Sequence, residues 1–165
     1  MCGIIGYIGV KPANEVIFDG LTKLEYRGYD SAGIAVVDKG SIHCRKDIGK
    51  LRNIRKLLLD DFQSESTIGI GHTRWATHGR PSAFNAHPHA DCNNSLMVAH
   101  NGIIENFMAL RRQLIEEGHK FVSETDSEVL AHLVEKYYKG DLKAAVIEAT
   151  KRVEGAYAIA VIHKD

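Results

Sequence analysis

Apolar and polar positions recur along the chain with two periods, one typical of strands and one typical of helices. Short apolar runs bounded by glycine, proline or polar residues indicate buried strands. They predict strands over residues 2–9, 32–37, 41–46, 67–74, 94–100 and 156–163. Apolar residues three and four positions apart predict helices over residues 12–24, 51–62, 104–117, 127–138 and 142–153. The chain therefore has more strands than a simple β-α-β alternation would contain.

The connection between the second and third of these strands indicates antiparallel pairing. Asp38-Lys39-Gly40 is short and contains glycine, as hairpin turns do. This pairing favours an α+β layered sandwich over a doubly wound parallel sheet. The closing strand is strongly apolar, and only Lys164 and Asp165 follow it. We expect it to lie inside a larger sheet, and the domain to continue beyond residue 165.

Composition limits the partners and the compartment. A chain of 165 residues suits one domain with a substantial core. Lys+Arg and Asp+Glu are balanced at 21 each, so the charge favours neither nucleic acid nor an anionic membrane as a partner. The opening apolar run ends at Lys11 and has no basic flank, unlike a secretory signal or a membrane span. Cys2, Cys44 and Cys92 form no C-x-x-C pair, so we expect reduced thiols in a cytoplasmic protein.

Cys2 is the first candidate for chemistry, because it directly follows the initiator methionine in "MCGIIGYIG". A free cysteine is usually a small buried hydrophobe, and that interpretation suits the head of a strand. If Met1 is removed, however, Cys2 carries a thiol and a free α-amine on one carbon. An α-amine titrates near pH 8 (about 7.7–8.0), so it can accept the thiol proton near neutral pH.

A cysteine nucleophile that attacks a carbonyl group needs hydrogen-bond donors for the oxyanion that forms. Asn101-Gly102 offers a side-chain amide and an unobstructed backbone N–H. The alternative is a hairpin turn, since Asn-Gly is the strongest short signal for one. The residues that follow have helical periodicity, so we place the pair at a strand-to-helix junction, where a helix N-terminus would favour negative charge.

The polar stretch over residues 75–89 lacks periodicity, and a loop of that length in a compact domain is more often functional than idle. Just before this stretch, Arg74 has a forked guanidinium suited to a carboxylate. Trp75, its first residue, is large enough to cover a small pocket. Asp126 could hold an ammonium group. The alternative for "TDSE" is a capping box, with Thr125 as the cap and Glu128 three positions later.

The nine histidines raise the question of a metal site. His87, His89 and Cys92 lie close together in "HPHADC", but their spacing matches no familiar zinc pattern and no second ligand pair follows. We interpret them as loop residues and expect no metal. No glycine-rich phosphate loop or dinucleotide fingerprint is present, so we expect no cofactor either.

Six segments together closely resemble the glutamine amidotransferase domain of the glutamine:fructose-6-phosphate aminotransferase (glucosamine-6-phosphate synthase) family. They are "CGIIGYIG", "LEYRGYDSAG", "GHTRWATHGRPS", "NAHPH", "HNGIIEN" and "SETDSEV". The resemblance implies a four-layer αββα sandwich of the N-terminal nucleophile hydrolase type, with mainly antiparallel sheets. Residues 1–165 would form an incomplete type 2 amidotransferase domain that lacks its C-terminal end, and the sugar isomerase domains would be absent.

The resemblance also implies a role for each matching residue. Cys2 would be the nucleophile, and Asn101 and Gly102 would form the oxyanion hole. Arg74 would bind the glutamine α-carboxylate and Asp126 its α-ammonium. Thr77 and His78 would line the glutamine loop. Trp75, also among the glutamine-binding residues, would gate the escape of ammonia. Arg27 would support the surroundings of the nucleophile.

The implied reaction is hydrolysis of L-glutamine to glutamate and ammonia through a Cys2 thioester. Ammonia would serve the synthesis of glucosamine 6-phosphate from fructose 6-phosphate, a substrate bound only by the absent C-terminal domain of a homo-oligomeric enzyme. Two alternatives remain open. One is an amidotransferase domain of purine or asparagine synthesis, which shares the terminal cysteine and an R-G-x-D element. The other is an inactive domain used for binding or assembly.

Overall fold

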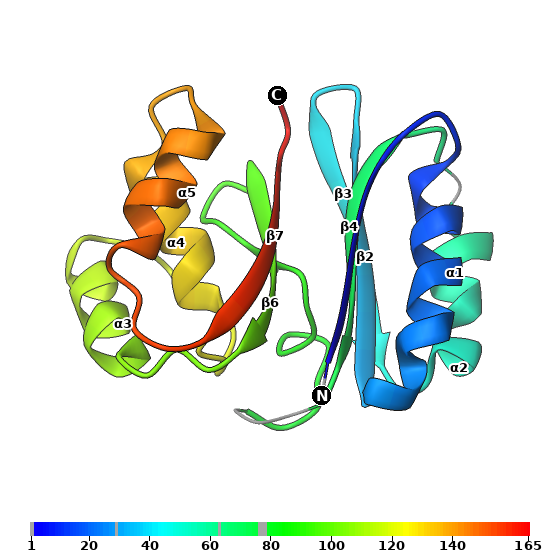
Figure 1. Ribbon diagram of the computed structural model, residues 1–165, viewed down its shortest axis with the longest axis horizontal. Helices are drawn as coiled ribbons and strands as arrows, with labels where there is room; N and C mark the ends of the chain where they lie inside the picture. The colour runs from blue at the N-terminus through cyan, green and yellow to red at the C-terminus, as the bar shows by residue number, and fades with distance from the viewer. Residues whose placement is uncertain (1, 29, 63, 76–78) are drawn as a thin grey trace.

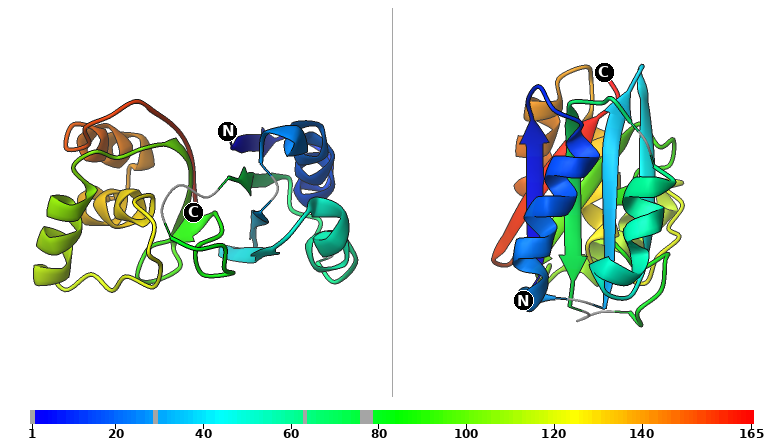
Figure 2. Two further views of the ribbon diagram at one scale, coloured as in Figure 1. Left: turned by 90° about the horizontal axis from the view of Figure 1, so that it is seen from below. Right: turned by 90° about the vertical axis from the view of Figure 1, so that its right-hand side faces the viewer.

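The computed structural model describes residues 2–28, 30–62, 64–75 and 79–165, which form four stacked layers (Figure 1). Two antiparallel sheets lie face to face in the middle, and helices cover the outer face of each sheet. The turned views show the same order of layers (Figure 2). This arrangement confirms the expected four-layer αββα sandwich of the α+β class.

The first sheet consists of β1 (Gly3–Ile8), β2 (Ser31–Asp38), β3 (Ser41–Ile48) and β4 (Ile68–Arg74). The strands are ordered β1-β4-β2-β3, and each neighbouring pair is antiparallel. The β2–β3 hairpin turns at Lys39 and Gly40, whose φ angles of 47° and 74° are the left-handed values of a two-residue type I′ turn. All these strands lie where the hydrophobic pattern predicts them.

Within the described residues, the second sheet consists of β5 (His89–Ala90), β6 (Leu96–Gly102) and β7 (Tyr157–His163). They are ordered β5-β6-β7 and pair antiparallel. β6 and β7 were predicted, whereas β5 lies at the end of the stretch interpreted as a loop. Two residues are too few to show a strand period. In the described chain β7 forms an edge of the sheet, so its place inside a larger sheet stays a prediction.

The described helices flank the sheets on opposite sides (Figure 1). The first sheet is covered by α1 (Ala13–Leu24) and α2 (Leu51–Arg55), which runs on into the π-helical turn η2 (Lys56–Asp60). A 3₁₀ turn, η1 (Glu25–Arg27), follows α1. The second sheet is covered by α3 (Phe107–Glu116), α4 (Glu128–Tyr137) and α5 (Leu142–Thr150). In the described part of the chain, none of these is long and apolar enough to cross a membrane.

Each boundary between neighbouring layers has its own hydrophobic cluster. Ile17, Leu21 and Ile34 belong to the cluster between α1, α2 and the first sheet. Ala35, Ile70 and Ala99 belong to the one between the two sheets. The third cluster, beneath α3, α4 and α5, includes the following residues: Leu96, Val98, Leu114, Leu130 and Ala145. Alternate residues of β2 and of β6 therefore serve opposite faces, as the strand period requires.

Side-chain alternation along β6 decides which residues face the first sheet. Met97 and Ala99 belong to the cluster between the sheets, whereas Leu96 and Val98 pack under the helices. Asn101 continues the inward-facing series, because side chains two positions apart share a face of a strand. This places the Asn101 amide opposite the start of β1.

Close packing of α1 on the first sheet depends on a glycine in β4. A Cβ atom at Gly71 would overlap the side chain of Ile17 and lie 3.0 Å from a methyl carbon of Leu21. Both of these α1 residues are fully buried. Glycine here lets the helix lie directly against the backbone of the central strand, so the fit between the two elements leaves no room for a methyl group.

We expect Gly71→Ala to lower the free energy of unfolding by about 1–3 kcal/mol, because the extra carbon overpacks a tight helix–sheet contact. Denaturant unfolding followed by circular dichroism measures this. Gly6→Ala is the matched control in β1, since a Cβ atom there would have nothing within 4 Å, and it should change stability by less than about 0.5 kcal/mol. Equal effects of the two substitutions would contradict the packing argument.

Candidate active site

A cavity of about 320 Å³ opens at one end of the sandwich. It lies where the start of β1, the end of β4 and the end of β6 meet the loop before α4. Its lining includes Cys2, Arg74, Trp75, His87, His100, Asn101, Gly102, Ile103, Thr125, Asp126 and Ser127. Six of the residues that the sequence nominated are therefore brought together, although they are up to 124 positions apart in the chain.

The thiol of Cys2 lies beside the end of β4. The β1–β4 pairing sets Gly3 opposite Thr73, so Cys2 comes next to the residues that leave β4. Its Sγ accepts the backbone N–H of Trp75 at 3.1 Å and lies 3.5 Å from the Trp75 carbonyl oxygen. Burial raises the pKa of the Cys2 thiol, while the Trp75 N–H lowers it. Because the net shift is upward, the thiol needs a base to become a nucleophile near neutral pH.

Asn101 reaches across from the second sheet to the first. Its Nδ2 donates to the carbonyl oxygen of Cys2 at 3.1 Å, and its Oδ1 lies 2.9 Å from Nε2 of His72. The same Nε2 lies 3.0 Å from the His100 carbonyl oxygen. Both neighbours are acceptors, so Nε2 carries the proton and donates to them. The Asn101 amide is thereby oriented with its NH₂ group toward Cys2.

His72 holds this amide from the buried layer between the sheets, and sequence reasoning missed it. Burial lowers its pKa to about 4, so the ring is neutral at physiological pH. Its ring stacks on that of His87 with the centroids 4.1 Å apart. Nδ1 of His87 accepts the backbone N–H of His100 at 3.2 Å. Burial also lowers the pKa of His87 and His100, so two neutral rings line the cavity and the neutral ring of His72 lies behind them.

Gly102 ends β6 in a backbone conformation that favours glycine. Its φ is 127°, and a Cβ atom there would overlap the carbonyl oxygen of Ala156. In the β6–β7 pairing it stands opposite Tyr157. The hairpin alternative for Asn101-Gly102 is wrong, because both residues belong to β6 and pair with β7, and the next element along the chain is the helix α3. The pair does lie between a strand and a helix. The prediction that the helix N-terminus directly follows it is wrong, however, since α3 begins only at Phe107.

Arg74 and Asp126 bring opposite charges to the cavity, and each is only 3% exposed. Nη2 of Arg74 donates to the Gly79 carbonyl oxygen at 3.3 Å. Burial lowers the pKa of Arg74, and the charges of Asp30 and Asp126 oppose this shift. Oδ2 of Asp126 accepts the backbone N–H of Ile104 at 2.9 Å. The pair could hold the two charged groups of an amino acid.

The capping-box interpretation of "TDSE" is wrong. α4 begins at Glu128, and its N-cap residue Ser127 makes no side-chain capping bond. The Glu128 carboxylate instead accepts the backbone N–H groups of Val122 and Ser123, both at 2.8 Å. Oγ1 of Thr125 lies 3.0 Å from Nε2 of His89 and does not cap the helix. These contacts fix the loop that carries Asp126.

The remaining predicted residues differ in how far the structure describes them. Trp75 lines the cavity and is 49% exposed. Thr77 and His78 lie outside the described residues. Arg27 ends η1, directly after the helix that packs on β1, but its side chain is outside the described part.

The interpretation of His87 and His89 as loop residues needs correction for the second of them. His89 belongs to β5, and both rings are buried. Neither joins Cys92 in a group with metal-binding geometry among the residues described. The residues missed by sequence reasoning, His72, His100 and Ser127, form buried hydrogen bonds, with His100 Nδ1 2.7 Å from Ser127 Oγ. Their spacing in the sequence does not show that they meet, because His72 and His100 lie in different sheets and Ser127 lies just before α4, so only the packing of these elements brings them together.

Two face-to-face antiparallel sheets between helical layers, with a cysteine at the head of a strand that opens into the cavity, define an N-terminal nucleophile hydrolase fold. The chain belongs more particularly to the glutamine amidotransferase domain family, whose model matches residues 72–165.

Curated relatives and solved structures agree with this assignment. The chain is 54% identical over its whole length to glutamine--fructose-6-phosphate aminotransferase [isomerizing] of Caldanaerobacter subterraneus subsp. tengcongensis, of which it covers 27%. It is 55% identical, with the same coverage, to the protein of that name from Clostridium perfringens. The glutamine phosphoribosylpyrophosphate amidotransferase structure from B. subtilis superposes with a TM-score of 0.81 at 29% identity, over 99% of this chain and 35% of that one. The chain thus spans about a quarter of the length of these aminotransferases.

A buried neutral histidine makes stability depend on pH. The pKa of His72 is about 4 in the folded protein and about 6.5 when unfolded, so the unfolded chain binds the extra proton. Stability is therefore complete above the unfolded pKa and falls as the pH drops toward the folded one. We expect His72 to account for about 3 kcal/mol of this loss. Denaturant unfolding across this range, with NMR titration of the ring, measures it. A His72 ring that titrates near its unfolded pKa would refute the expectation.

Proposed function

We propose that this domain hydrolyses L-glutamine to glutamate and ammonia, with Cys2 as the nucleophile. One observation carries the proposal: Cys2, Asn101, Gly102, Arg74 and Asp126 line the same cavity. A nucleophile, oxyanion donors and two opposite charges are the parts that acyl transfer from an amino acid amide requires. Membership of the glutamine amidotransferase family supports this substrate.

The reaction begins with proton transfer from the Cys2 thiol to its own α-amine, which becomes available once Met1 is removed. The thiolate attacks the carboxamide carbon of glutamine and forms a tetrahedral oxyanion. The Asn101 Nδ2–H and the Gly102 N–H donate to this oxygen. The amine then returns its proton to the leaving nitrogen, and ammonia departs as the thioester forms. A water molecule, deprotonated by the same amine, hydrolyses the thioester to glutamate.

Recognition of glutamine rests on the charged pair beside the nucleophile. The Arg74 guanidinium binds the α-carboxylate, and the Asp126 carboxylate binds the α-ammonium. Both side chains are buried, so each charge is screened less by water than on the surface. We assign Thr77 and His78 to the loop that binds glutamine, Trp75 to gating the escape of ammonia, and Arg27 to supporting the surroundings of Cys2.

In the whole protein, we propose that the ammonia is used to make glucosamine 6-phosphate from fructose 6-phosphate. The names of the relatives above support this, and identities of 54% and 55% to them exceed the 29% to the phosphoribosylpyrophosphate amidotransferase. The sugar phosphate would be bound by a C-terminal part beyond residue 165, in a cytoplasmic homo-oligomeric enzyme. Nucleic acid and membranes have no role in the proposal.

Removal of the nucleophile tests the proposed chemistry. Protein freed of Met1 should release ammonia from glutamine and take a covalent label on Cys2 from a glutamine-mimicking diazoketone. Cys2→Ala should abolish both, because the thioester cannot form. Cys44→Ala is the matched control, since that thiol is not among the residues that line the cavity. Ammonia release that persists in Cys2→Ala would overturn the proposal, and so would a lack of both reactions in Met1-free protein.

Variants of Asn101 and Asp126 should change different kinetic constants, because the first residue is assigned to oxyanion stabilisation and the second to substrate binding. Asn101→Ala should lower kcat by about 10²–10³ with little change in KM, because its amide acts on the transition state. Asp126→Asn should mainly raise KM, because it weakens the grip on the ammonium in both ground and transition states. Asp61→Asn is the control and should leave kcat and KM unchanged, because Asp61 is exposed and is not among the residues that line the cavity. Steady-state ammonia assays decide the matter, and an unchanged kcat in Asn101→Ala would exclude the proposed oxyanion role.

A further inference from the structure

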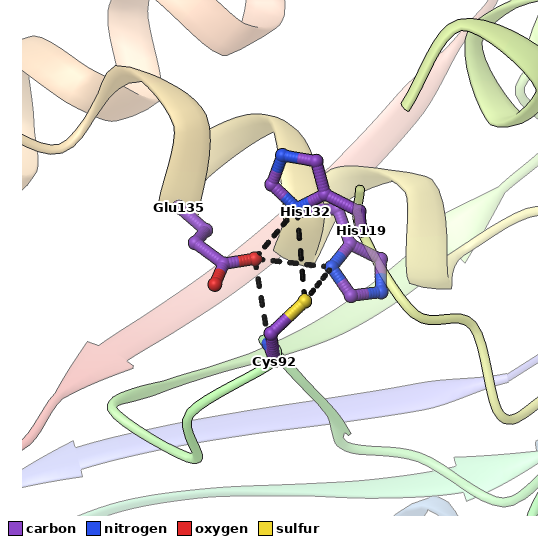
Figure 3. A group of neighbouring side chains, drawn as sticks. All are labelled: Cys92, His119, His132 and Glu135. Atoms are coloured by element: carbon purple, nitrogen blue, oxygen red, sulfur yellow. Dashed lines mark hydrogen bonds and ion pairs between the residues drawn. The ribbon is translucent and has the colours of Figure 1, made fainter. Parts of the chain in front are cut away.

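A second group of reactive side chains lies outside the cavity, on the helical side of the second sheet (Figure 3). Cys92 comes from the turn between β5 and β6, and His119 comes from the loop between α3 and α4. His132 and Glu135 lie one turn apart on α4. One ligand atom from each residue lies within 4.8 Å of all the others. Figure 3 shows the four side chains pointing toward a common centre.

The sulfur–nitrogen distances within this cluster are close to those between the ligands of a zinc ion, whereas its nitrogen–oxygen distances are shorter. Sγ of Cys92 lies 3.7 Å from Nδ1 of His119 and 3.6 Å from Nδ1 of His132. Oε2 of Glu135 lies 2.8 Å and 3.1 Å from the same two nitrogens. Tetrahedral zinc, with bonds of about 2.3 Å to sulfur and about 2.0 Å to nitrogen or oxygen, separates sulfur from nitrogen by about 3.5 Å and nitrogen from oxygen by about 3.3 Å.

Neighbouring groups orient the ligand atoms toward the centre. Nδ2 of Asn93 donates to Oε1 of Glu135 at 3.2 Å, which leaves Oε2 directed at the cluster. The backbone N–H of Lys120 donates to Sγ of Cys92 at 3.4 Å. Nε2 of His132 lies 3.7 Å from Oε1 of Glu128. A histidine that binds a metal through one nitrogen commonly directs the other at a carboxylate in this way.

We propose that Cys92, His119, His132 and Glu135 bind a structural zinc ion. Zinc favours a tetrahedral set of sulfur, nitrogen and carboxylate oxygen ligands, whereas magnesium and calcium require oxygen ligands. With four protein ligands, no position remains open for a substrate. The role of the ion is therefore to tie the β5–β6 turn and the α3–α4 loop to α4, the helix that begins just after Asp126.

The cluster has one competing explanation, a hydrogen-bonded group without a metal. In that case the two histidines donate their Nδ1 protons to the shared Glu135 oxygen. This accounts for the short nitrogen–oxygen distances but gives no reason for a thiol equidistant from both nitrogens. The two explanations differ in their response to metal ions.

Cobalt(II) titration followed by absorption spectroscopy tests the proposal. About one equivalent should give the intense visible bands of a tetrahedral site and a sulfur-to-cobalt charge-transfer band. Cys92→Ser should lose the charge-transfer band, and His119→Gln should weaken cobalt binding. Cys2→Ala, Cys44→Ala and His43→Gln are the controls and should keep the bands, because their side chains lie outside the cluster.

Thermal unfolding provides an independent measurement. Zinc at about 100 times its Kd should raise Tm by about 5–10 °C, and a chelator should reverse this. Cys92→Ser should keep the circular dichroism spectrum of the parent protein, since Cys92 is exposed, but lose the rise in Tm. The absence of the cobalt bands, survival of the charge-transfer band in Cys92→Ser, loss of the bands in Cys2→Ala or an unchanged Tm with zinc would each overturn the proposal.

Discussion

The hydrogen bonds that cross between the two sheets at His72, Asn101 and Cys2 are the interaction on which the site depends. His72 belongs to the first sheet and donates to the second, and Asn101 belongs to the second and donates back to the first. The two sheets are thereby fixed relative to one another at the end where Cys2 lies. Because the His72 ring is buried, loss of its partners would leave its Nε2 unsatisfied in a dry interface, which costs about 1–3 kcal/mol.

Two alanines help the sheets to approach one another, within a cluster that also holds larger side chains such as Ile70 and Met97. Ala35 and Ala99 face one another's sheets in the central cluster, and this lets the backbones approach closely enough for one asparagine to span the gap. On the far side of the first sheet, Gly71 admits α1 in the same way. The stability of the sandwich and the precision of the site therefore come from the same close approach of layers.

The sequence predicts the layers better than it predicts the contacts between them. Six strands and the helices followed from hydrophobic period, and Cys2, Asn101 and Arg74 stood out through their chemistry and motifs. β5 could not be found because two residues show no period. His72 reads as an ordinary strand residue, and its partner Asn101 is determined only by how the two sheets pack. Cys92 and His119 meet His132 for the same reason, since loops far apart in the chain converge on α4.

The Asn101 amide has two N–H donors, and the structure gives each a different direction. One donates to the main-chain carbonyl oxygen of Cys2. In the proposed reaction the other is the donor that meets the oxyanion. A single side chain therefore holds the backbone of the residue that attacks and stabilises the charge that the attack creates, so the spacing between the two is set by one rigid planar group.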